Sequence, residues 1–331
     1  MKKIMNKAEN IVIEMCEGMQ KAYPEQLCFS KKNKVMVRKT LKKNKVVLIS
    51  GGGSGHEPAH AGFVGTGMLD AAVCGDVFAS PSTFQVYNAI RDTKSDKGTL
   101  LIIKNYSGDC MNFDSASEMA HEDEGIVVES VYVNDDVAVE DSLYTIGRRG
   151  VAGTVFVHKI AGAAAEEGLE LLAVKTIAQK VIDNVRTMGF AFTSCTVPAK
   201  GSPTFELAED EIEFGVGIHG EPGVTKETIV SADELAIKIL DKIINDLPYN
   251  NYDEVAVLIN GFGGTPLQEL YILNNSVANI LENRKIKIYK TFVGNFMTAL
   301  DMSGASVTLL KLDKELKHFL DAPVVTPVLQ N

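Results

Sequence analysis

The chain has 331 residues, of which 45% are hydrophobic and 23% charged, and its formal net charge is −10. This composition is typical of a globular protein, and the acidic charge disfavours direct binding of nucleic acid. No apolar run approaches the roughly 20 residues that a membrane-spanning helix needs, and polar residues interrupt the N-terminal stretch where a signal peptide would be apolar. We therefore expect a soluble cytoplasmic protein with no membrane partner.

The first half of the chain alternates between predicted strands and helices. The basic run from Lys31 to Lys45 is most simply a solvated hairpin that leads into a buried strand. Apolar runs that end in glycine or polar residues predict strands, and small or amphipathic stretches after Ser or Gly predict helices. The predicted strands are 46–50, 99–106 and 126–133, and the predicted helices are 82–91 and 153–168.

The second half begins after a predicted amphipathic helix at 173–188. Its predicted strands are 211–219, 255–260 and 285–293. The length and this alternation predict an α/β protein with two domains, each a mixed β-sheet flanked by helices. We place the first domain at residues 1–182, with the GGGSGHEPAH and KNYSGD loops, and the second at 183–331, with the GVGIHGEPG histidine.

The stretch SGGGSGHEPAH, residues 50–60, has several possible interpretations. A phosphate loop of the G-x-x-x-x-G-K-[ST] type needs a lysine and a hydroxyl where this chain has His56 and Glu57. The letters HEPAH match the H-E-x-x-H pattern of zinc proteases, but Pro58 prevents both histidines from lying on one helix face. What remains is a strand, a glycine turn and a helix N-terminus that begins near Glu57, where backbone N–H groups can meet a polar ligand. A turn that needs glycine only for its backbone angles is the competing interpretation.

Two other polar groups lie at or just beyond the ends of predicted strands. Asp109, in KNYSGD, would meet His56 if their strands are neighbours, because ligands of open α/β sheets bind beyond the carboxyl ends of strands. Asp109 could equally cap the next helix. His219 lies among glycines in GVGIHGEPG, and a neutral imidazole there is either a structural hydrogen-bonding group or a usable nucleophile. We expect the histidines at 60, 121, 158 and 318 to be structural or exposed.

Long motifs resemble the dihydroxyacetone-binding subunit of the dihydroxyacetone kinase family. The resemblance covers almost the whole chain, and it is carried by LISGGGSGHEPAHAGFVGTGMLDAAVCGDVFASPS, LIIKNYSGDCMNF, VNDDVAVEDSLYTIGRRGVAGTV, SCTVPAKG and EFGVGIHGEPG. It implies a dimeric α/β protein in which His219 adds to the ketone carbon of dihydroxyacetone as a hemiaminal. It also implies that Gly53, His56, Lys104 and Asp109 hold the hydroxyls, with Asp109 as the base for the hydroxyl that is phosphorylated and His56 as a hydrogen-bond partner of that hydroxyl.

The resemblance also bears on partners and cofactors. The chain ends at Asn331 without room for the nucleotide-binding domain of the single-chain kinases, so we expect no cofactor here and ADP with Mg²⁺ on a separate subunit. That subunit would be recharged by the phosphoenolpyruvate phosphotransferase system. The alternative is a catalytically silent paralogue that senses dihydroxyacetone and acts as coactivator of a transcription regulator. Phe63, Thr66 and Phe84 depart from the family pattern, outside the residues that hold the triose.

Overall fold

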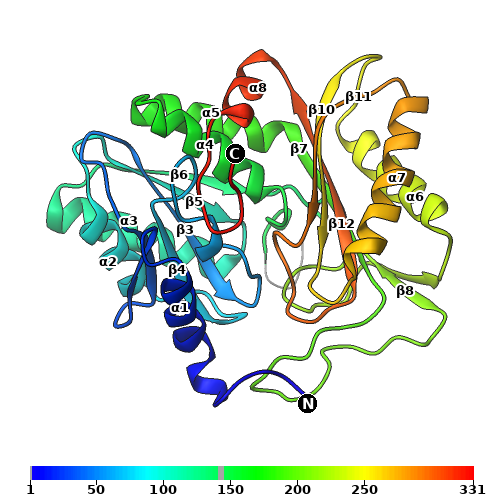
Figure 1. Cartoon of the computed structure of the whole chain (residues 1–331), viewed down its shortest axis with the longest axis horizontal. Helices are drawn as coiled ribbons and strands as arrows, with labels where there is room; N and C mark the ends of the chain where they lie inside the picture. The colour runs from blue at the N-terminus through cyan, green and yellow to red at the C-terminus, as the bar shows by residue number, and fades with distance from the viewer. Residues whose placement is uncertain (1, 141–144) are drawn as a thin grey trace.

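The computed structural model describes residues 2–140 and 145–331, and it contains two six-stranded mixed sheets flanked by helices (Figure 1). The predicted fold class is therefore confirmed. In the described residues, no helix is both long enough and apolar enough to cross a membrane.

The first sheet has the strand order β1-β2-β4-β3-β5-β6. Its strands are β1 (Leu27–Ser30), β2 (Val35–Arg38), β3 (Val47–Ser54), β4 (Ala71–Val77), β5 (Thr99–Lys104) and β6 (Val128–Val133). The pairs of β4, β3, β5 and β6 are parallel, and the β1–β2 hairpin is added antiparallel at the β4 edge. Strands β3 and β5 are buried along their whole length, as expected for parallel strands that are covered on both faces.

Two pairs of helices cover this sheet, and the side chains of β5 alternate between them. Leu101 and Ile103 join a core with α2 (Thr83–Thr93) and α3 (Ser107–Glu124), whereas Leu100 and Ile102 join a core with α4 (Thr154–Glu166) and α5 (Leu171–Asn184). The helix α1 (Ile11–Ala22) packs near β1 and β4, after the short 3-10 turn at Ala8–Asn10. Because β3 and β5 are parallel neighbours, their carboxyl ends lie at the same edge of the sheet.

The second sheet has the order β11-β10-β12-β7-β8-β9. Its strands are β7 (Val185–Ala191), β8 (Glu211–Phe214), β9 (Thr225–Thr228), β10 (Glu254–Gly261), β11 (Lys287–Gly294) and β12 (Gly304–Leu312). Only the β10–β11 pair is parallel. Helices α6 (Ala232–Asp246) and α7 (Leu267–Asn283) cover the outer face, on the right of Figure 1.

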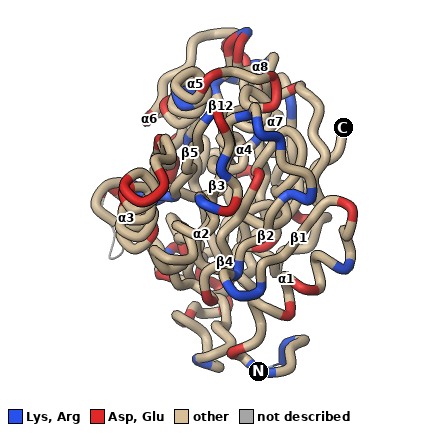
Figure 2. The backbone as a smooth tube through the Cα atoms, turned by 90° about the vertical axis from the view of Figure 1, so that its left-hand side faces the viewer, with Lys and Arg blue, Asp and Glu red and all other residues tan. Residues whose placement is uncertain are grey.

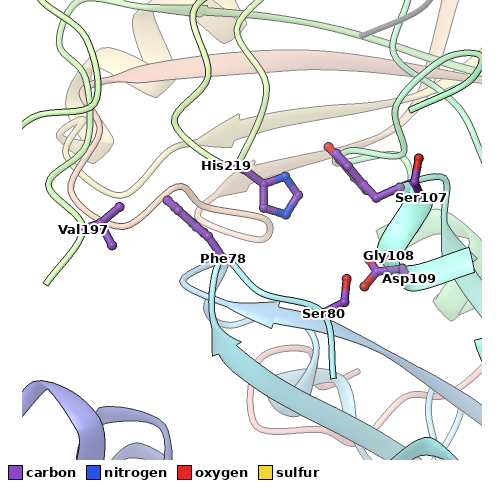
Figure 3. A pocket seen from close by; sticks show the side chains of 8 residues that line it. Phe78, Ser80, Ser107, Gly108, Asp109, Val197 and His219 are labelled. Carbon is purple, nitrogen blue, oxygen red and sulfur yellow. The ribbon is translucent and has the colours of Figure 1, made fainter. Parts of the chain in front are cut away.

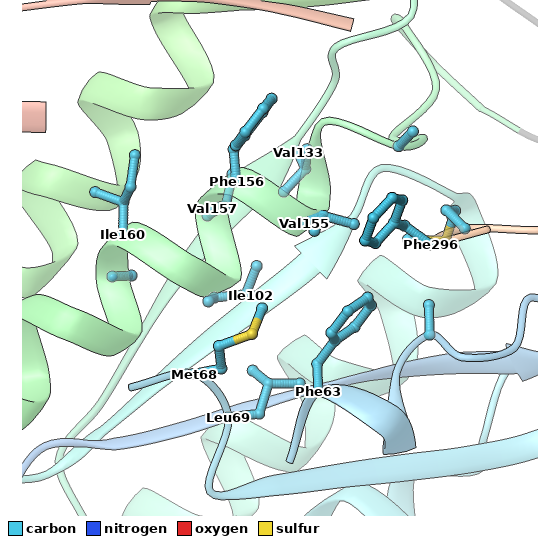
Figure 4. Packing of buried hydrophobic residues seen from close by; sticks show 14 of the residues in the cluster. Phe63, Met68, Leu69, Ile102, Val133, Val155, Phe156, Val157, Ile160 and Phe296 are labelled. Atoms are coloured by element: carbon cyan, nitrogen blue, oxygen red, sulfur yellow. The ribbon is translucent and has the colours of Figure 1, made fainter. Parts of the chain in front are cut away.

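The two halves share a hydrophobic core. Figure 4 shows Phe296, from the connection between β11 and β12, beside Phe63 and Val155 of the first half. Helix α5 contacts both β6 and β12, and α8 (Lys314–Asp321) packs on α4. The division near residue 182 falls inside α5 and stays a prediction.

Several predicted boundaries are wrong. The helix predicted to reach residue 188 ends at Asn184, because the backbone of 185–191 pairs with β12 as strand β7. The strand predicted for 211–219 ends at Phe214, so His219 lies in a loop. The basic run does belong to a hairpin, but many of its charges are paired: Lys34 with Asp76 at 2.5 Å, and Lys45 with Asp70 at 2.5 Å. Basic and acidic segments accordingly alternate on this side of the molecule (Figure 2).

Candidate functional site

Lys104 and Asp109 meet at the carboxyl end of β5. Because β3 and β5 are parallel neighbours, the loops that follow them lie at the same edge of the sheet. Lys104 Nζ lies 3.4 Å from Asp109 Oδ2, and both side chains are buried. Asp109 lies in the first turn of α3, where the helix dipole favours a carboxylate, but its side chain makes no helix cap. Its Oδ1 atom is buried with no hydrogen-bond partner among the described residues.

The glycines of the first loop leave room for this ion pair and for the neighbouring turn. A Cβ atom on Gly52 would lie 2.5 Å from Lys104 Nζ and 3.3 Å from Asp109 Oδ2. A Cβ on Gly53 would lie 2.7 Å from the backbone nitrogen of Ala79. Gly53 therefore allows the 78–79 turn to approach β3 closely, and its role in holding the ligand remains a prediction.

The segment after these glycines is not a helix N-terminus, so that prediction is wrong. Residues 57–60 form turns and are followed only by a short 3-10 turn at Ala61–Phe63. The carbonyls that would start a helix accept hydrogen bonds from the second half of the chain instead. Thr298 N donates to His56 O at 3.1 Å, Thr298 Oγ1 donates to Glu57 O at 2.8 Å, and Leu300 N donates to Gly55 O at 2.8 Å.

The side chain of His56 is fixed by the same segment. Its Nδ1 lies 2.8 Å from the carbonyl oxygen of Thr298, and because a carbonyl can only accept, Nδ1 carries the proton. Burial, helped by the charge of Lys104, lowers the pKa of His56 to about 3. The ring is therefore neutral at pH 7, and Nε2, which is buried and has no partner in the described part of the chain, is a hydrogen-bond acceptor.

His219 reaches the same place from the second half. Its loop connects β8 to β9, and its ring stands edge-on to three aromatic rings, with centroid distances of 4.4 Å to Tyr106, 4.7 Å to His56 and 5.5 Å to Phe78. Desolvation by these neighbours lowers the pKa of His219 well below its usual value, and the charges of Lys104 and Arg149 act in the same direction. The imidazole is thus neutral at pH 7, which is the nucleophilic form.

A cavity of about 520 Å³ opens beside His219. It is lined by Phe78, Ser80, Tyr106, Ser107, Gly108, Asp109, Val197 and His219. In Figure 3 the His219 ring projects into the space between Phe78 and Asp109. Of the five residues predicted for the site, His219 and Asp109 line this cavity. His56 and Lys104 lie behind the lining, where His56 stacks on Phe78 at 5.3 Å and Lys104 Nζ lies 5.4 Å from the Tyr106 ring centre.

The remaining histidines lie outside the cavity lining. His60 and His158 are buried with ring centroids 5.2 Å apart, and His121 and His318 are exposed. Over residues 2–140 and 145–331, no group of three or more His, Cys, Asp and Glu side chains is placed to hold a metal ion.

Comparison with known proteins places this geometry in a family. The Dak1 domain family matches residues 17–328. The chain belongs to the Dak1 family. It is 50% identical, over 98% of its length and 99% of the relative, to a dihydroxyacetone-binding subunit of a phosphotransferase-system-dependent dihydroxyacetone kinase from Listeria innocua.

Two solved structures resemble the chain over nearly its whole length. The dihydroxyacetone kinase of C. freundii superimposes with a TM-score of 0.91 at 38% identity over 98% of this chain, which spans 60% of that longer protein. A dihydroxyacetone kinase operon co-activator superimposes with a TM-score of 0.89, also at 38% identity, over 95% of this chain and 96% of the co-activator. Solved structures with this fold thus include both a dihydroxyacetone kinase and a dihydroxyacetone kinase operon co-activator.

Sequence reasoning missed several residues of this Dak1 site. Phe78 and Tyr106 enclose the His219 ring. They belong to the motifs GDVFASPS and KNYSGD, but an aromatic residue in such a motif does not by itself indicate a role in the site. Thr298, which fixes His56, lies 242 residues away in the chain with no local motif to mark it. The aromatic residues could have been found from their places beside the polar motif residues, but Thr298 could not.

The three positions that we expect to depart from the family pattern differ in their surroundings. Phe63 is fully buried in the core, and Thr66 accepts a hydrogen bond from Arg38 Nη2 at 2.9 Å. Phe84, in the first turn of α2, is 66% exposed. Of these three positions, only Phe84 offers a large apolar side chain to solvent.

Proposed function

We propose that this protein binds dihydroxyacetone as a hemiaminal on His219 and presents it for phosphorylation to dihydroxyacetone phosphate. A separate ADP-carrying subunit of a phosphoenolpyruvate-dependent kinase would supply the phosphoryl group. The observation that carries the proposal is the meeting of a neutral, partly exposed His219 imidazole with buried Lys104, Asp109 and His56 at one cavity. The Listeria innocua relative, at 50% identity, is a dihydroxyacetone-binding subunit, which supports the same ligand.

The addition of the His219 imidazole to the ketone of dihydroxyacetone needs no reactant other than these two. The unprotonated ring nitrogen of His219 attacks the ketone carbon, the carbonyl π electrons move to oxygen, and that oxygen takes up a proton. The other ring nitrogen gives up its proton, so the product is a neutral hemiaminal. A covalent test for a carbonyl group rejects glycerol, which has similar hydroxyls but no carbon that the imidazole can attack.

The hydroxyls would be held from the first half of the chain. His56 Nε2 and Asp109 Oδ1 are buried acceptors without partners in the described residues, and a hydroxyl placed between them would donate its proton to one of them. With a pKa of about 3, His56 is a weak base and serves as the hydrogen-bond partner. Asp109 would therefore accept the proton as the phosphoryl group arrives. Lys104 and the backbone of Gly53 would complete the set of hydroxyl contacts.

The proposal assigns the partners as follows. The working unit would be a cytoplasmic homodimer with no cofactor of its own, and the donor subunit would bring ADP and Mg²⁺. The first two turns of α2 and α3 expose Phe84 and Met111, which are 66% and 64% exposed. These turns are tied together because Asn112 Nδ2 donates to Pro81 O at 2.9 Å. Ser80 and Gly108 of the cavity lie next to these turns, so we place the donor contact there.

The second candidate is a sensor. The co-activator with a TM-score of 0.89 aligns over 96% of its own length and 95% of this chain. A catalytically silent paralogue that senses dihydroxyacetone and contacts a transcription regulator would therefore have the same fold. The ligand site would be shared, and the difference would lie in the surfaces that meet a partner.

One assay separates the two functions. The protein is mixed with the ADP-carrying subunit, its phosphotransferase proteins and phosphoenolpyruvate, and dihydroxyacetone phosphate is measured. The kinase function predicts turnover that requires this chain. Captured dihydroxyacetone without turnover would contradict the kinase function and favour the sensor.

A further inference from the structure

Arg149 is a buried guanidinium that the proposed chemistry does not use. It is 1% exposed and lies between β6 and α4, in the first half of the chain. Its Nε donates to Asp136 Oδ2 at 2.8 Å, and its Nη2 donates to the carbonyl oxygen of Gly215 at 2.7 Å. Its Nη1 donates to Glu221 Oε1 at 3.2 Å. Arg149 thus joins the first half to the loop that carries His219.

Glu221 connects Arg149 to His219, because its carboxylate contacts both residues. The other carboxylate oxygen of Glu221 accepts the backbone N–H of His219 at 2.9 Å. A Cβ on Gly217 would lie 1.6 Å from Glu221 Oε1 and 2.8 Å from Arg149 Nη1, so the glycine of GVGIH makes room for the ion pair. The contacts form a continuous path from Asp136 through Arg149 and Glu221 to the backbone of His219.

The backbone of Arg149 is fixed to the strand end that carries Lys104. A Cβ on the following residue, Gly150, would lie 2.4 Å from the carbonyl oxygen of Val133 and 3.0 Å from Lys104 Cα. Asn105 Nδ2 donates to the carbonyl oxygen of Arg148 at 2.8 Å. The same short segment therefore touches the hydroxyl-binding side of the cavity with its backbone and the His219 loop with its side chain.

We propose that Arg149, acting through Glu221 and anchored by Asp136, is a positioning residue that holds His219 in register with Lys104 and Asp109. This inference rests on the proposed function for the identity of the ligand. The planar guanidinium suits the task because it donates in three fixed directions at once, which a lysine cannot do. Its loss would leave two buried carboxylates without a counter-charge and would free the loop.

This clamp, made of Asp136, Arg149 and Glu221, also affects the protonation of His219. The titratable and charged groups near this imidazole are His56 and Tyr106, by ring contact, together with Lys104 and Arg149. The carboxylate of Glu221 accepts the backbone N–H of His219. Arg149 is one of the charges that lower the pKa of His219. Removing it while Glu221 stays ionised would raise that pKa, and more of the ring would be protonated in mildly acidic solution.

The test compares Arg149→Met with Arg148→Met. Arg148 is the matched control because its guanidinium pairs with Asp246 of α6, at 2.8 Å, rather than with the His219 loop. Two quantities are measured on each full-length variant: dihydroxyacetone retained after gel filtration at pH 8, and the pKa of His219 from NMR titration of ¹³C-labelled histidine. We expect Arg149→Met to reduce retention at least tenfold and to raise the pKa of His219. We expect Arg148→Met to match the wild type in both, and Arg149→Lys to restore the pKa but not the retention.

Two outcomes would overturn the inference. One is a folded Arg149→Met variant with wild-type retention of dihydroxyacetone and wild-type titration of His219. The other is an Arg148→Met variant that loses as much retention as Arg149→Met. If Arg149→Met does not fold, Glu221→Gln, which keeps the shape of the side chain and removes its charge, must weaken retention; wild-type retention there would contradict the clamp. If the wild type retains no dihydroxyacetone, the proposed function fails, and the His219 titration alone decides the clamp.

Discussion

The imidazole of His219 stands edge-on to that of His56, with ring centroids 4.7 Å apart and ring planes at 85°. The two rings come from different sheets, and burial keeps the pKa of each below its usual value, so they meet without charge repulsion. The His56 ring is fixed by the Thr298 carbonyl and offers an acceptor, whereas the His219 ring is held, in the part of the chain that the structure describes, by ring contacts and by its backbone. This difference suits one ring to hydrogen bonding and the other to attack on a carbonyl carbon.

Asp109→Asn should leave capture of dihydroxyacetone intact and slow phosphoryl transfer. The amide keeps the shape of the side chain but cannot accept the hydroxyl proton, and a lost general base costs on the order of 100-fold or more in rate. Transfer is measured as dihydroxyacetone phosphate formed with saturating donor subunit, and capture as retention through gel filtration. A variant that transfers within about threefold of the wild type would remove Asp109 from the role of base.

Gly52→Ala should disrupt the buried contact between Lys104 and Asp109. The added Cβ would lie 2.5 Å from Lys104 Nζ, so the buried Lys104–Asp109 pair must shift, and we expect capture to weaken at least tenfold. Gly18→Ala is the control: this exposed position in α1 has no atom within 4 Å of the added Cβ, and alanine there should be neutral or slightly stabilising. Equal capture by both variants would contradict a role for the Lys104–Asp109 geometry.

Phe84→Asp should separate donor docking from ligand capture. We expect a raised KM for the donor subunit, by about tenfold as for a lost interface anchor, with unchanged retention of dihydroxyacetone. Leu172→Asp is the matched control, because Leu172 on α5 is also 66% exposed but lies away from the cavity lining. If both variants leave the KM for the donor unchanged, the donor does not dock on the first turn of α2.

The buried histidines should make the fold sensitive to acid. Burial lowers the pKa of His158 to about 3, whereas the unfolded chain takes up this proton near pH 6.5. Between these values the unfolded state binds more protons, so stability falls as the pH falls from about 6.5 towards 3. His158→Leu should therefore shift the midpoint of acid unfolding to lower pH, by on the order of a few tenths of a unit.

Circular dichroism across that pH range measures the midpoint. His121→Leu is the control, because His121 is exposed near the end of α3. A midpoint for His158→Leu that stays at or above that of His121→Leu would show that His158 is not a source of the acid sensitivity.

The parts of the fold that were predictable have strong local patterns. The apolar runs of β3 and β5 and the Ser82 capping box of α2 mark their elements directly in the sequence. The end of α5 was missed because Val185–Ala191 continues its apolar pattern, and only pairing with the distant β12 makes it a strand. The turn at 57–60 was missed for a similar reason, since the carbonyls of residues 55–57 are engaged by residues 298 and 300.

The same distinction applies to the site. His56, Lys104, Asp109 and His219 stand in polar or glycine-rich motifs, and the parallel pairing of β3 with β5 brings the first three together. Arg149 and Glu221 form a contact across 72 residues that no spacing in the sequence reveals. Residues whose role depends on long-range packing were therefore found only in the structure.

NMR tests directly whether a covalent bond forms between His219 and dihydroxyacetone. The protein, with ¹⁵N-labelled histidine, is mixed with dihydroxyacetone labelled with ¹³C at the ketone carbon. We predict a bound ¹³C signal in the sp³ region, split by one-bond coupling to ¹⁵N, that is absent from the His219→Ala variant. A bound signal in the ketone region, or an sp³ signal without coupling to nitrogen, would contradict the account.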